Sequence, residues 1–214
     1  VRGSNLVKTK YSPDGTTTRG TNNNCANGYT PWGTYLTCEE NFTNVISRAA
    51  GDNALRSAAE VTALNRYRLK QGTNSGYLWN TPTTGNADDY ARWTASVTGA
   101  SAADDYRNAF NTFGWVVEID PFNPSSKPVK RSALGRFAHE GAWPCNPVAG
   151  KPLVFYMGDD SQNEYIYKFV SKANWDTADI GRGLAAGAKY MDEGTLYVAK
   201  FNTDGSGTWV ELTF

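Results

Sequence analysis

The 214-residue chain carries no formal net charge, because 21 lysines and arginines balance 21 aspartates and glutamates. This balance argues against a nucleic-acid partner, which requires a basic excess or stripe. No apolar run approaches the ~18 residues that a membrane span requires, and three cysteines fit neither a dense disulfide framework nor a cysteine-rich zinc module.

The composition predicts short β-strands joined by frequent turns. Aromatic residues make up 13% of the chain, and 21 glycines and nine prolines supply turn chemistry at short intervals. Such a chain is typical of a sandwich, barrel or propeller, and its length suits one all-β domain or two small ones. Because the chain starts at Val1 without a charged and then apolar leader, we expect a signal peptide to be absent or already removed.

The first predicted elements lead to an unusually polar stretch. Residues 5–11 alternate weakly and end in the turn signal Ser-Pro-Asp-Gly, which predicts an edge strand followed by a hairpin turn. Residues 21–42 then combine two cysteines, three asparagines and the turn Thr-Pro-Trp-Gly. A strand is predicted from Thr34, so Glu39 and Glu40 are expected where it ends, a common position for functional side chains.

A helical insertion is predicted to interrupt the β-rich sequence around residues 44–112. Alanines and leucines recur at helical spacing and predict one helix over residues 52–69. Short helical turns are expected at residues 90–93 and 102–110. We therefore expect a single β domain, residues 1–214, that carries this insertion.

The second half of the chain predicts strands in pairs. Residues 113–119 (FGWVVEI) are expected to form a single strand. Two strand pairs follow: residues 153–157 and 164–170 flank an acidic turn, and residues 195–201 and 208–213 flank Asp-Gly-Ser-Gly. Residues 181–188 are expected to be a glycine-rich connector. Strand pairs joined by acidic glycine turns are typical of consecutive propeller blades.

Carboxylates are the best candidates for a metal site. The single histidine excludes the multi-histidine zinc arrangement, and Cys-x-x-Cys is absent. Carboxylates brought together from different strand ends favour calcium, magnesium or ferric iron, and a cysteine among them would select a transition metal at one position. Glu118 interrupts an apolar strand, where a buried carboxylate needs a partner. The acidic candidates at turns and strand ends are Glu39, Glu40, Glu118, Glu140, Asp159, Asp160, Asp192 and Glu193.

Several of these residues also have structural explanations. Cys25 and Cys38 could form a disulfide worth roughly 3 kcal/mol, and Cys145 is expected to be a buried small hydrophobe. His139 could be a general base or a phosphate contact, although a lone histidine is more often a hydrogen-bonded structural group. The serine elbow, the phosphate-binding loop and the His-Glu-x-x-His motif are all absent.

Five blocks of sequence together resemble the PhoX-type alkaline phosphatases. They occur in the order expected for that family and span nearly the whole chain. Family members are longer and carry a further metal-binding aspartate block, so the chain resembles an internal segment or a trimmed relative. The blocks are NNCANGYTPWGTYLTCEENF, GWVVEIDPF, GRFAHEGAW, VFYMGDDSQNEYIYKFVS and DEGTLYVAKFN.

The resemblance implies a β-propeller and an exported, periplasmic or extracellular, enzyme. It implies hydrolysis of a small phosphate ester at a ferric iron and Ca²⁺ centre held by carboxylates and one cysteine. Transfer by motif makes Cys25 the iron ligand and assigns Glu40, Glu118 and Glu193 to the metals. Secondary metal candidates are Glu39, Glu140 and Asp159, and His139 is the candidate for substrate binding.

Two other functions remain open from the sequence. One is a calcium-dependent propeller hydrolase of lactones or phosphotriesters, whose purely calcium centre would have no use for the Cys25 thiolate. The other is a non-catalytic, calcium-stabilised β-domain that binds a partner through its many tyrosines and tryptophans. In that protein Cys25 and Cys38 would form a disulfide.

Overall fold

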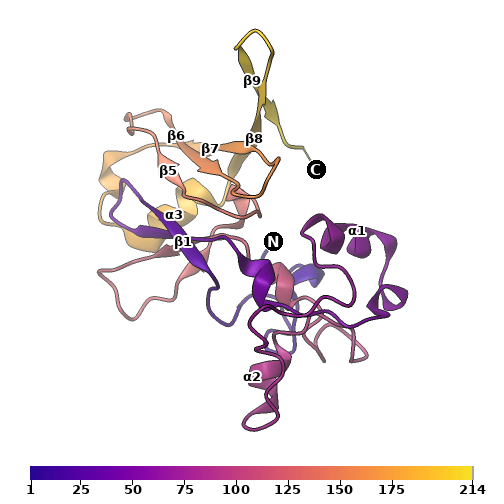
Figure 1. The fold of residues 1–214 in the computed structure, drawn as a ribbon. Helices are drawn as coiled ribbons and strands as arrows, with labels where there is room; N and C mark the ends of the chain where they lie inside the picture. The colour runs from indigo at the N-terminus through magenta and orange to yellow at the C-terminus, as the bar shows by residue number, and fades with distance from the viewer. Residues whose placement is uncertain (214) are drawn as a thin grey trace. The chain divides into compact units, whose positions relative to one another are not determined.

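The computed structural model describes residues 1–213 and divides the chain into two compact units, each described below by itself. Unit 1 comprises residues 1–20 and 41–113, and unit 2 comprises residues 21–40 and 114–213. Phe214 lies outside the described residues. The elements (Figure 1) are η1 (Asn5–Val7), β1 (Asn24–Tyr29), β2 (Tyr35–Glu39), η2 (Phe42–Val45), η3 (Asp52–Leu55), α1 (Ala58–Arg66), α2 (Ala87–Ala91), η4 (Ala109–Thr112), β3 (Val116–Ile119), β4 (Val129–Lys130), η5 (Ser132–Leu134), β5 (Trp143–Pro144), β6 (Pro152–Gly158), β7 (Ile166–Asn174), η6 (Thr177–Asp179), α3 (Gly183–Met191), β8 (Gly194–Phe201) and β9 (Gly207–Glu211).

Unit 1 contains the helical insertion, but the helix is shorter than predicted. Where the sequence predicts one helix over residues 52–69, the structure has the 3-10 turn η3 and then α1. Arg56 between them is extended, and Ser57 starts α1 with a capping box, in which Ser57 and Glu60 each accept the other's backbone N–H. Because Ser57 caps the helix, α1 begins at Ala58 rather than at the predicted residue 52.

The edge strand predicted for residues 5–11 is wrong. The structure has the 3-10 turn η1 there, and the Ser4 hydroxyl accepts the Leu6 N–H as its cap. Thr9 and Ser12 then exchange backbone hydrogen bonds in a tight turn. Local capping by serine and threonine competes here with strand pairing.

Asp105 holds a loop of unit 1 together through hydrogen bonds, and its ionisation makes the stability of the fold depend on pH. Its carboxylate accepts the N–H groups of Thr98 and Gly99 at 2.8 and 2.9 Å, and Arg107 Nη2 at 2.8 Å. Burial alone would raise the pKa of Asp105, but these hydrogen bonds, with that from the Arg107 side chain the strongest, lower it to about 2. The ionised form is thus stabilised by folding.

Because the pKa is lowered by folding, this stabilisation is complete above the ordinary aspartate pKa and is lost as the pH falls toward about 2. We expect Asp105→Asn to lower the free energy of unfolding at pH 7 by about 1–2 kcal/mol, with allowance for solvent screening, and to weaken the acid dependence. Urea unfolding at pH 7 and near pH 3 measures both. The neighbouring Asp104→Asn is the control, and equal effects of the two changes would contradict the assignment.

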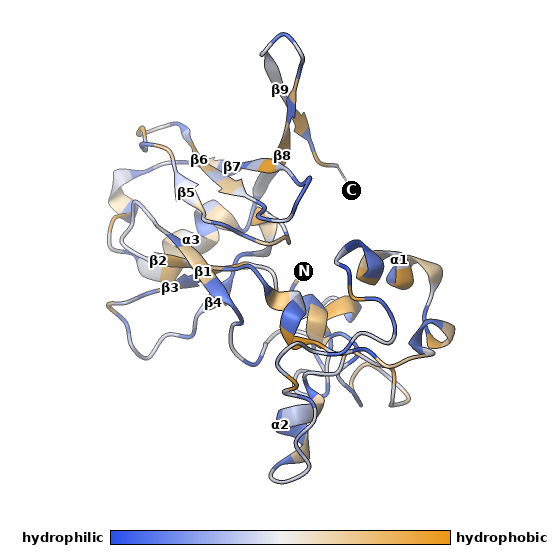
Figure 2. Ribbon diagram, in the orientation of Figure 1, coloured by the Kyte–Doolittle hydropathy of each residue, from blue (hydrophilic) through white to orange (hydrophobic). Residues whose placement is uncertain are grey.

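Unit 2 consists of two antiparallel sheets. The first has four strands in the order β1-β2-β3-β4, and the second has five in the order β5-β6-β7-β8-β9. Each strand pairs with its neighbour in sequence, as hairpins do. Hydrophobic stretches of β6–β8 are interrupted by hydrophilic residues (Figure 2), and buried and exposed positions alternate along β6. The predicted strand pairs of the second half are confirmed.

A helix occupies the place of the predicted glycine-rich connector. Residues 183–191 form α3, whose Ala186, Tyr190 and Met191 are buried in the core of unit 2. A Cβ at Gly187 would lie 2.5 Å from Arg131 Nη2 and even closer to the Glu118 carboxylate, so only glycine allows this approach. The connector prediction was wrong because packing outweighed the low helix propensity of glycine.

The two sheets of unit 2 meet where β1 passes the chain that leads into β5. Ala142 N–H donates to Asn27 O at 3.4 Å, and His139 N–H donates to Glu39 O at 3.2 Å. A Cβ at Gly28 would lie 2.0 Å from Ala142 O, so this position requires glycine. We call this contact between the first and second sheets of unit 2 the seam.

The fold class is mainly β, as expected, with two open antiparallel sheets rather than a closed propeller among the described residues. Residues 41–113, close to the predicted insertion, belong to unit 1. The single-domain organisation stays a prediction. A search of the helices within residues 1–213 finds none with the length and apolarity that crossing a membrane demands.

Candidate metal centre

Four acidic or thiol side chains converge on the seam from four separate segments. Cys25 lies in β1, where the pairing of β1 with β2 is irregular because the register shifts between Asn24 and Asn27. Glu40 follows β2 directly, and its N–H donates to Asn23 O at 3.1 Å. Glu140 and Asp160 lie on two segments that pair with each other, since Glu140 N donates to Gly158 O and Asp160 N to Ala138 O, both at 3.0 Å.

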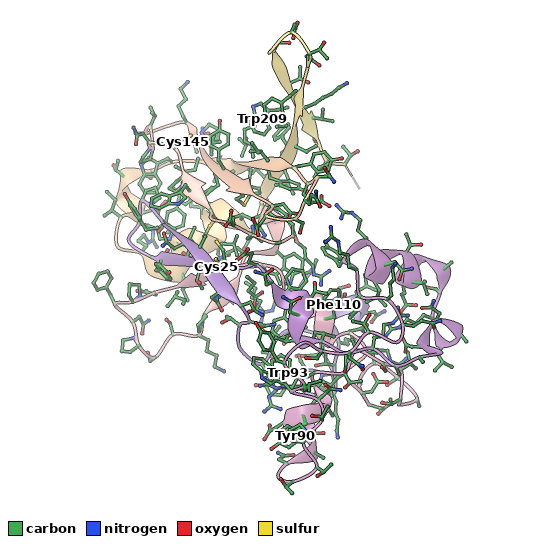
Figure 3. The ribbon with its side chains drawn as sticks, in the orientation of Figure 1. Cys25, Tyr90, Trp93, Phe110, Cys145 and Trp209 are labelled. Carbon is green, nitrogen blue, oxygen red and sulfur yellow. The ribbon has the colours of Figure 1, made fainter. Side chains whose placement is uncertain are left out.

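Three of these residues could hold one cation. The Cys25 Sγ and a carboxylate oxygen from each of Glu40 and Glu140 all lie within 4.8 Å of one another. Glu40 is buried, whereas Cys25, labelled on β1 in Figure 3, and Glu140 are exposed. Asp160 lies close to this group, and its side chain raises the pKa of Glu40. The group therefore has a buried base and an open side.

The electrostatics of the group favour a cation. A hydrogen bond with Glu40, then burial, then the charges of Glu40, Glu140 and Asp160 raise the pKa of the Cys25 thiol. The pKa of Glu40 is raised mainly by burial and also by Asp160 and Glu140, while the hydrogen bond from Cys25 lowers it. Like charges held this close disfavour ionisation, and a bound cation removes that cost.

Glu39 points into a different environment although it is adjacent to Glu40. It is fully buried and accepts the N–H groups of Asn22, Gly114 and Trp115 at 2.9 to 3.1 Å. Lys130 Nζ also donates to it at 2.8 Å. Burial raises the pKa of Glu39, against the opposing influence of Lys130. These bonds tie the end of β2 to the segments that precede β1 and β3.

Glu118 is buried, as its position in an apolar strand indicated, and has protein partners. Arg131 Nε donates to it at 2.7 Å, and Trp32 Nε1 and the Thr34 hydroxyl donate at 2.8 and 2.6 Å. Arg131 also donates to Asp192 at 3.0 Å. Glu118 therefore does not join the group at the seam, and its assignment as a ligand stays a prediction.

The other predicted ligands also lie elsewhere. Glu193 is exposed and forms an ion pair with Lys172 at 2.7 Å. Asp159 forms a bridge with His139, and its carboxylate accepts the Ser161 N–H at 2.9 Å. The hairpin that carries Asp159 instead brings its neighbour Asp160 to Glu40. The sequence showed both aspartates in one acidic turn but not which of them faces the seam.

The lone histidine is buried beside the group rather than facing solvent. The His139 ring lies 3.7 Å from that of Phe137, and its Nε2 is 3.1 Å from Gly135 O. Its Nδ1 has no hydrogen-bond partner among residues 1–213, and burial lowers the pKa of His139 to about 3. A neutral, enclosed imidazole suits packing, so contact with a substrate stays a prediction.

All three cysteines are free thiols. Cys38 is buried, and burial raises its pKa to about 12, so it is inert as a nucleophile. Cys145 was expected to be buried but is exposed, because it directly follows the short edge strand β5. This leaves Cys25 as the thiol that lies among carboxylates.

The donor set indicates which metals would fit. Carboxylate oxygens suit hard cations such as Ca²⁺ and ferric iron, whereas a thiolate favours a transition metal. Cys25 with Glu40 and Glu140 would therefore fit a transition-metal ion, and the carboxylates of the group would also suit a harder cation. Because Cys25 and Glu140 are exposed, a ligand from solvent can approach the site.

Comparison with known proteins supplies a family. The family model described as alkaline phosphatase PhoX matches residues 1–214. A solved structure of Pseudomonas fluorescens PhoX in complex with vanadate, a transition state analogue, is similar with a TM-score of 0.75 and 39% sequence identity. That match covers 99% of this chain and 33% of that chain, so the present chain spans about a third of its relative. A search of curated proteins found no match.

Proposed function

The chain belongs to the PhoX alkaline phosphatase family, and we propose on that premise that it contributes a metal centre that hydrolyses phosphate monoesters. The substrate is a small phosphate ester. The observation that carries the proposal is the convergence of Cys25, Glu40 and Glu140 within 4.8 Å. The Pseudomonas relative binds vanadate, an analogue of a transition state, which supports chemistry at phosphorus.

The proposed metals are ferric iron and Ca²⁺. Cys25 would hold the iron, and Glu40, Glu140 and Asp160 would hold the metals through oxygen. Bound cations supply charge neutralisation for the phosphoryl oxygens and orient an attacking oxygen. The family resemblance also proposes Glu118, Glu193, Glu39 and Asp159 as ligands, although each has other partners in the structure.

The side chains around the centre would fix its geometry. Glu40 is held at the base of the site by its own backbone bond to Asn23. Glu39 holds β2 against Gly114 and Trp115, which fixes the direction in which Glu40 leaves the strand. The exposed Cys25, Glu140 and Asp160 leave the opposite side open to a phosphate ester. A supporting shell of this kind keeps ligands in place for catalysis.

The two sheets of unit 2 would be blades of a β-propeller. Each is antiparallel and joins neighbours in sequence, as propeller blades do. A metal site at the seam between two sheets suits that architecture. The resemblance further supports a periplasmic or extracellular location.

The function is tested by metal analysis combined with a phosphatase assay. We expect the purified chain to contain iron and calcium, to hydrolyse p-nitrophenyl phosphate, and to lose that activity after chelation and regain it on addition of both metals. Because the chain spans about a third of its relative, the assay should be run on the full-length protein as well. Metal-free full-length protein without chelator-sensitive hydrolysis would exclude the function. Calcium without iron, together with lactone hydrolysis, would favour the lactonase-type alternative.

A further inference from the structure

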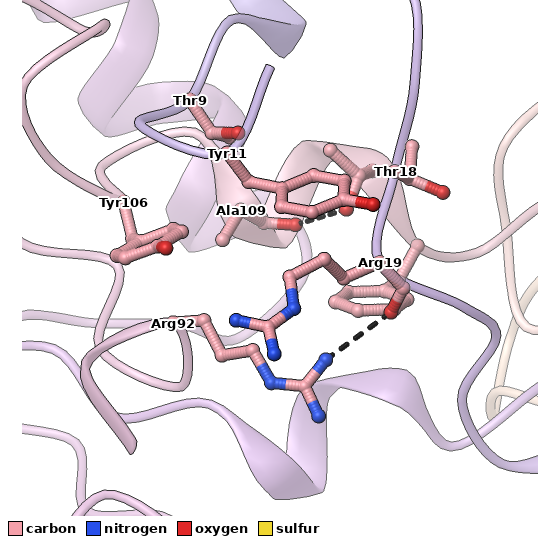
Figure 4. Close-up of a pocket in the computed structure, with 9 residues that line it drawn as sticks. Thr9, Tyr11, Thr18, Arg19, Arg92, Tyr106 and Ala109 are labelled. Atoms are coloured by element: carbon pink, nitrogen blue, oxygen red, sulfur yellow. Dashed lines mark hydrogen bonds between the residues drawn. The ribbon is translucent and has the colours of Figure 1, made fainter. Parts of the chain in front are cut away.

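Unit 1 contains a small pocket lined by two arginines that the proposed function does not use. Arg19 and Arg92 run next to each other across it, with Tyr11 and Tyr106 at its sides (Figure 4). The cavity has a volume of 20 Å³, above the roughly 10–15 Å³ that one water molecule requires. The enclosed space therefore holds about one water molecule, and a larger ligand would lie partly outside it, against the arginines.

The two arginines differ in how their charges are compensated. Arg19 Nη2 donates to the Asp89 carboxylate at 2.5 Å, which together with Tyr106 accounts for its raised pKa. Arg92 instead donates to backbone carbonyls, from Nη1 to Arg19 O at 3.2 Å and from Nε to Asp89 O at 3.4 Å. Among residues 1–213, Arg92 forms no ion pair with a carboxylate.

This arrangement leaves one cation in excess in a half-buried position. Burial, and next the charge of Arg19, lower the pKa of Arg92. The Arg92 guanidinium lies 4.2 Å from the centre of the Trp93 ring, and that of Arg19 lies 5.4 Å from the centre of the Tyr11 ring. These aromatic contacts hold both planar groups in defined orientations. Two oriented guanidinium groups, of which Arg19 alone is paired with a carboxylate, attract an anion.

We propose that the pocket between Arg19 and Arg92 binds a tetrahedral oxyanion of the phosphate class. The planar fork of Arg92 would donate to two oxygens of the anion, and the hydroxyl groups of Tyr11 and Tyr106 are further donors on the pocket wall. The ligand is either free phosphate or the phosphoryl group of an ester. The proposal rests on unit 1 alone and does not depend on the candidate metal centre.

Calorimetric titration of the chelated, metal-free chain with inorganic phosphate tests the proposal. We expect saturable binding that Arg92→Gln weakens by at least about tenfold and Arg92→Lys by less, because lysine keeps the charge without the fork. Arg2→Gln, at an exposed arginine of the same unit, should bind as the unaltered chain does. Near-ultraviolet circular dichroism of each variant shows whether unit 1 stays folded.

The possible results distinguish free phosphate from a phosphate ester as the ligand. They also distinguish phosphate binding in unit 1 from hydrolysis at the proposed metal centre. Competition by phenyl phosphate would mark the site as one for esters, and its failure to compete would mark a free-phosphate site. Absence of saturable phosphate binding, or equal affinity in folded Arg92→Gln and Arg2→Gln, would overturn the proposal. Since chelator is present throughout, such a result would leave the proposed hydrolysis unaffected.

Discussion

Replacing Arg131 with methionine should destabilise the chain by about 3–5 kcal/mol, the largest stability loss that we expect from a single substitution. Arg131 is 2% exposed and Glu118 is fully buried, and their side chains meet at 2.5 Å. Removal of the guanidinium leaves the Glu118 carboxylate without its cation in the core of unit 2. Urea unfolding followed by tryptophan fluorescence measures the loss, since Trp32 donates directly to Glu118.

Two further variants distinguish a structural ion pair from a general effect of charge. Lys172→Met breaks the exposed pair with Glu193 and should change stability far less, because water already screens that pair. The double variant Glu118→Gln and Arg131→Met removes both charges, keeps an acceptor for Trp32, and should recover part of the loss. If Arg131→Met costs no more than Lys172→Met, the buried pair does not stabilise unit 2.

The same region tests the ligand prediction for Glu118. If its role is to hold Arg131, Glu118→Gln should lower stability and leave the metal content unchanged. If it binds a metal, as the family resemblance implies, the metal content should fall. Elemental analysis of the purified variant therefore decides between the two roles.

If the proposed metal centre is right, replacing Cys25 with serine in the full-length protein should remove iron and lower phosphatase activity by about 100-fold or more, since substitutions in the shell around metal ligands alone cost 10–100-fold. Cys25 is the exposed thiol among carboxylates, and a serine hydroxyl is a poor ligand beside them. Cys145→Ser is the matched control, because Cys145 is also exposed but is not part of the group. Iron retained at full content in Cys25→Ser would refute the assignment.

Asp160 provides a second test of the same metal centre, with the neighbouring Asp159 as the matched control. Asp160→Asn should weaken metal binding because the Asp160 side chain reaches Glu40, whereas Asp159→Asn should have a smaller effect. The two changes are chemically identical and one residue apart, so both alter the net charge equally. The reverse order would support Asp159, the ligand suggested by the sequence.

The sequence alone determined the features that depend on short stretches of chain. Strand-forming runs flanking acidic glycine turns located the hairpins β6–β7 and β8–β9, because strand and turn preferences act over a few residues. The sequence showed that Glu118, a carboxylate in an apolar strand, would need a partner if it were buried, and in the structure it is buried against Arg131. Cys25 and Glu40 were also named from the sequence, but through the motifs that resemble the PhoX family rather than through local preferences.

Only the tertiary structure decided which side chains meet. Asp160 rather than Asp159 reaches Glu40 because the pairing of residues 138–140 with 158–160 sets the direction of each side chain. Arg131 is the partner of Glu118, and α3 forms from a glycine-rich stretch because Gly187 fits against that pair. Local preferences place an acidic residue at a strand end, but contacts between segments distant in sequence decide whether it faces a cation, an arginine or solvent.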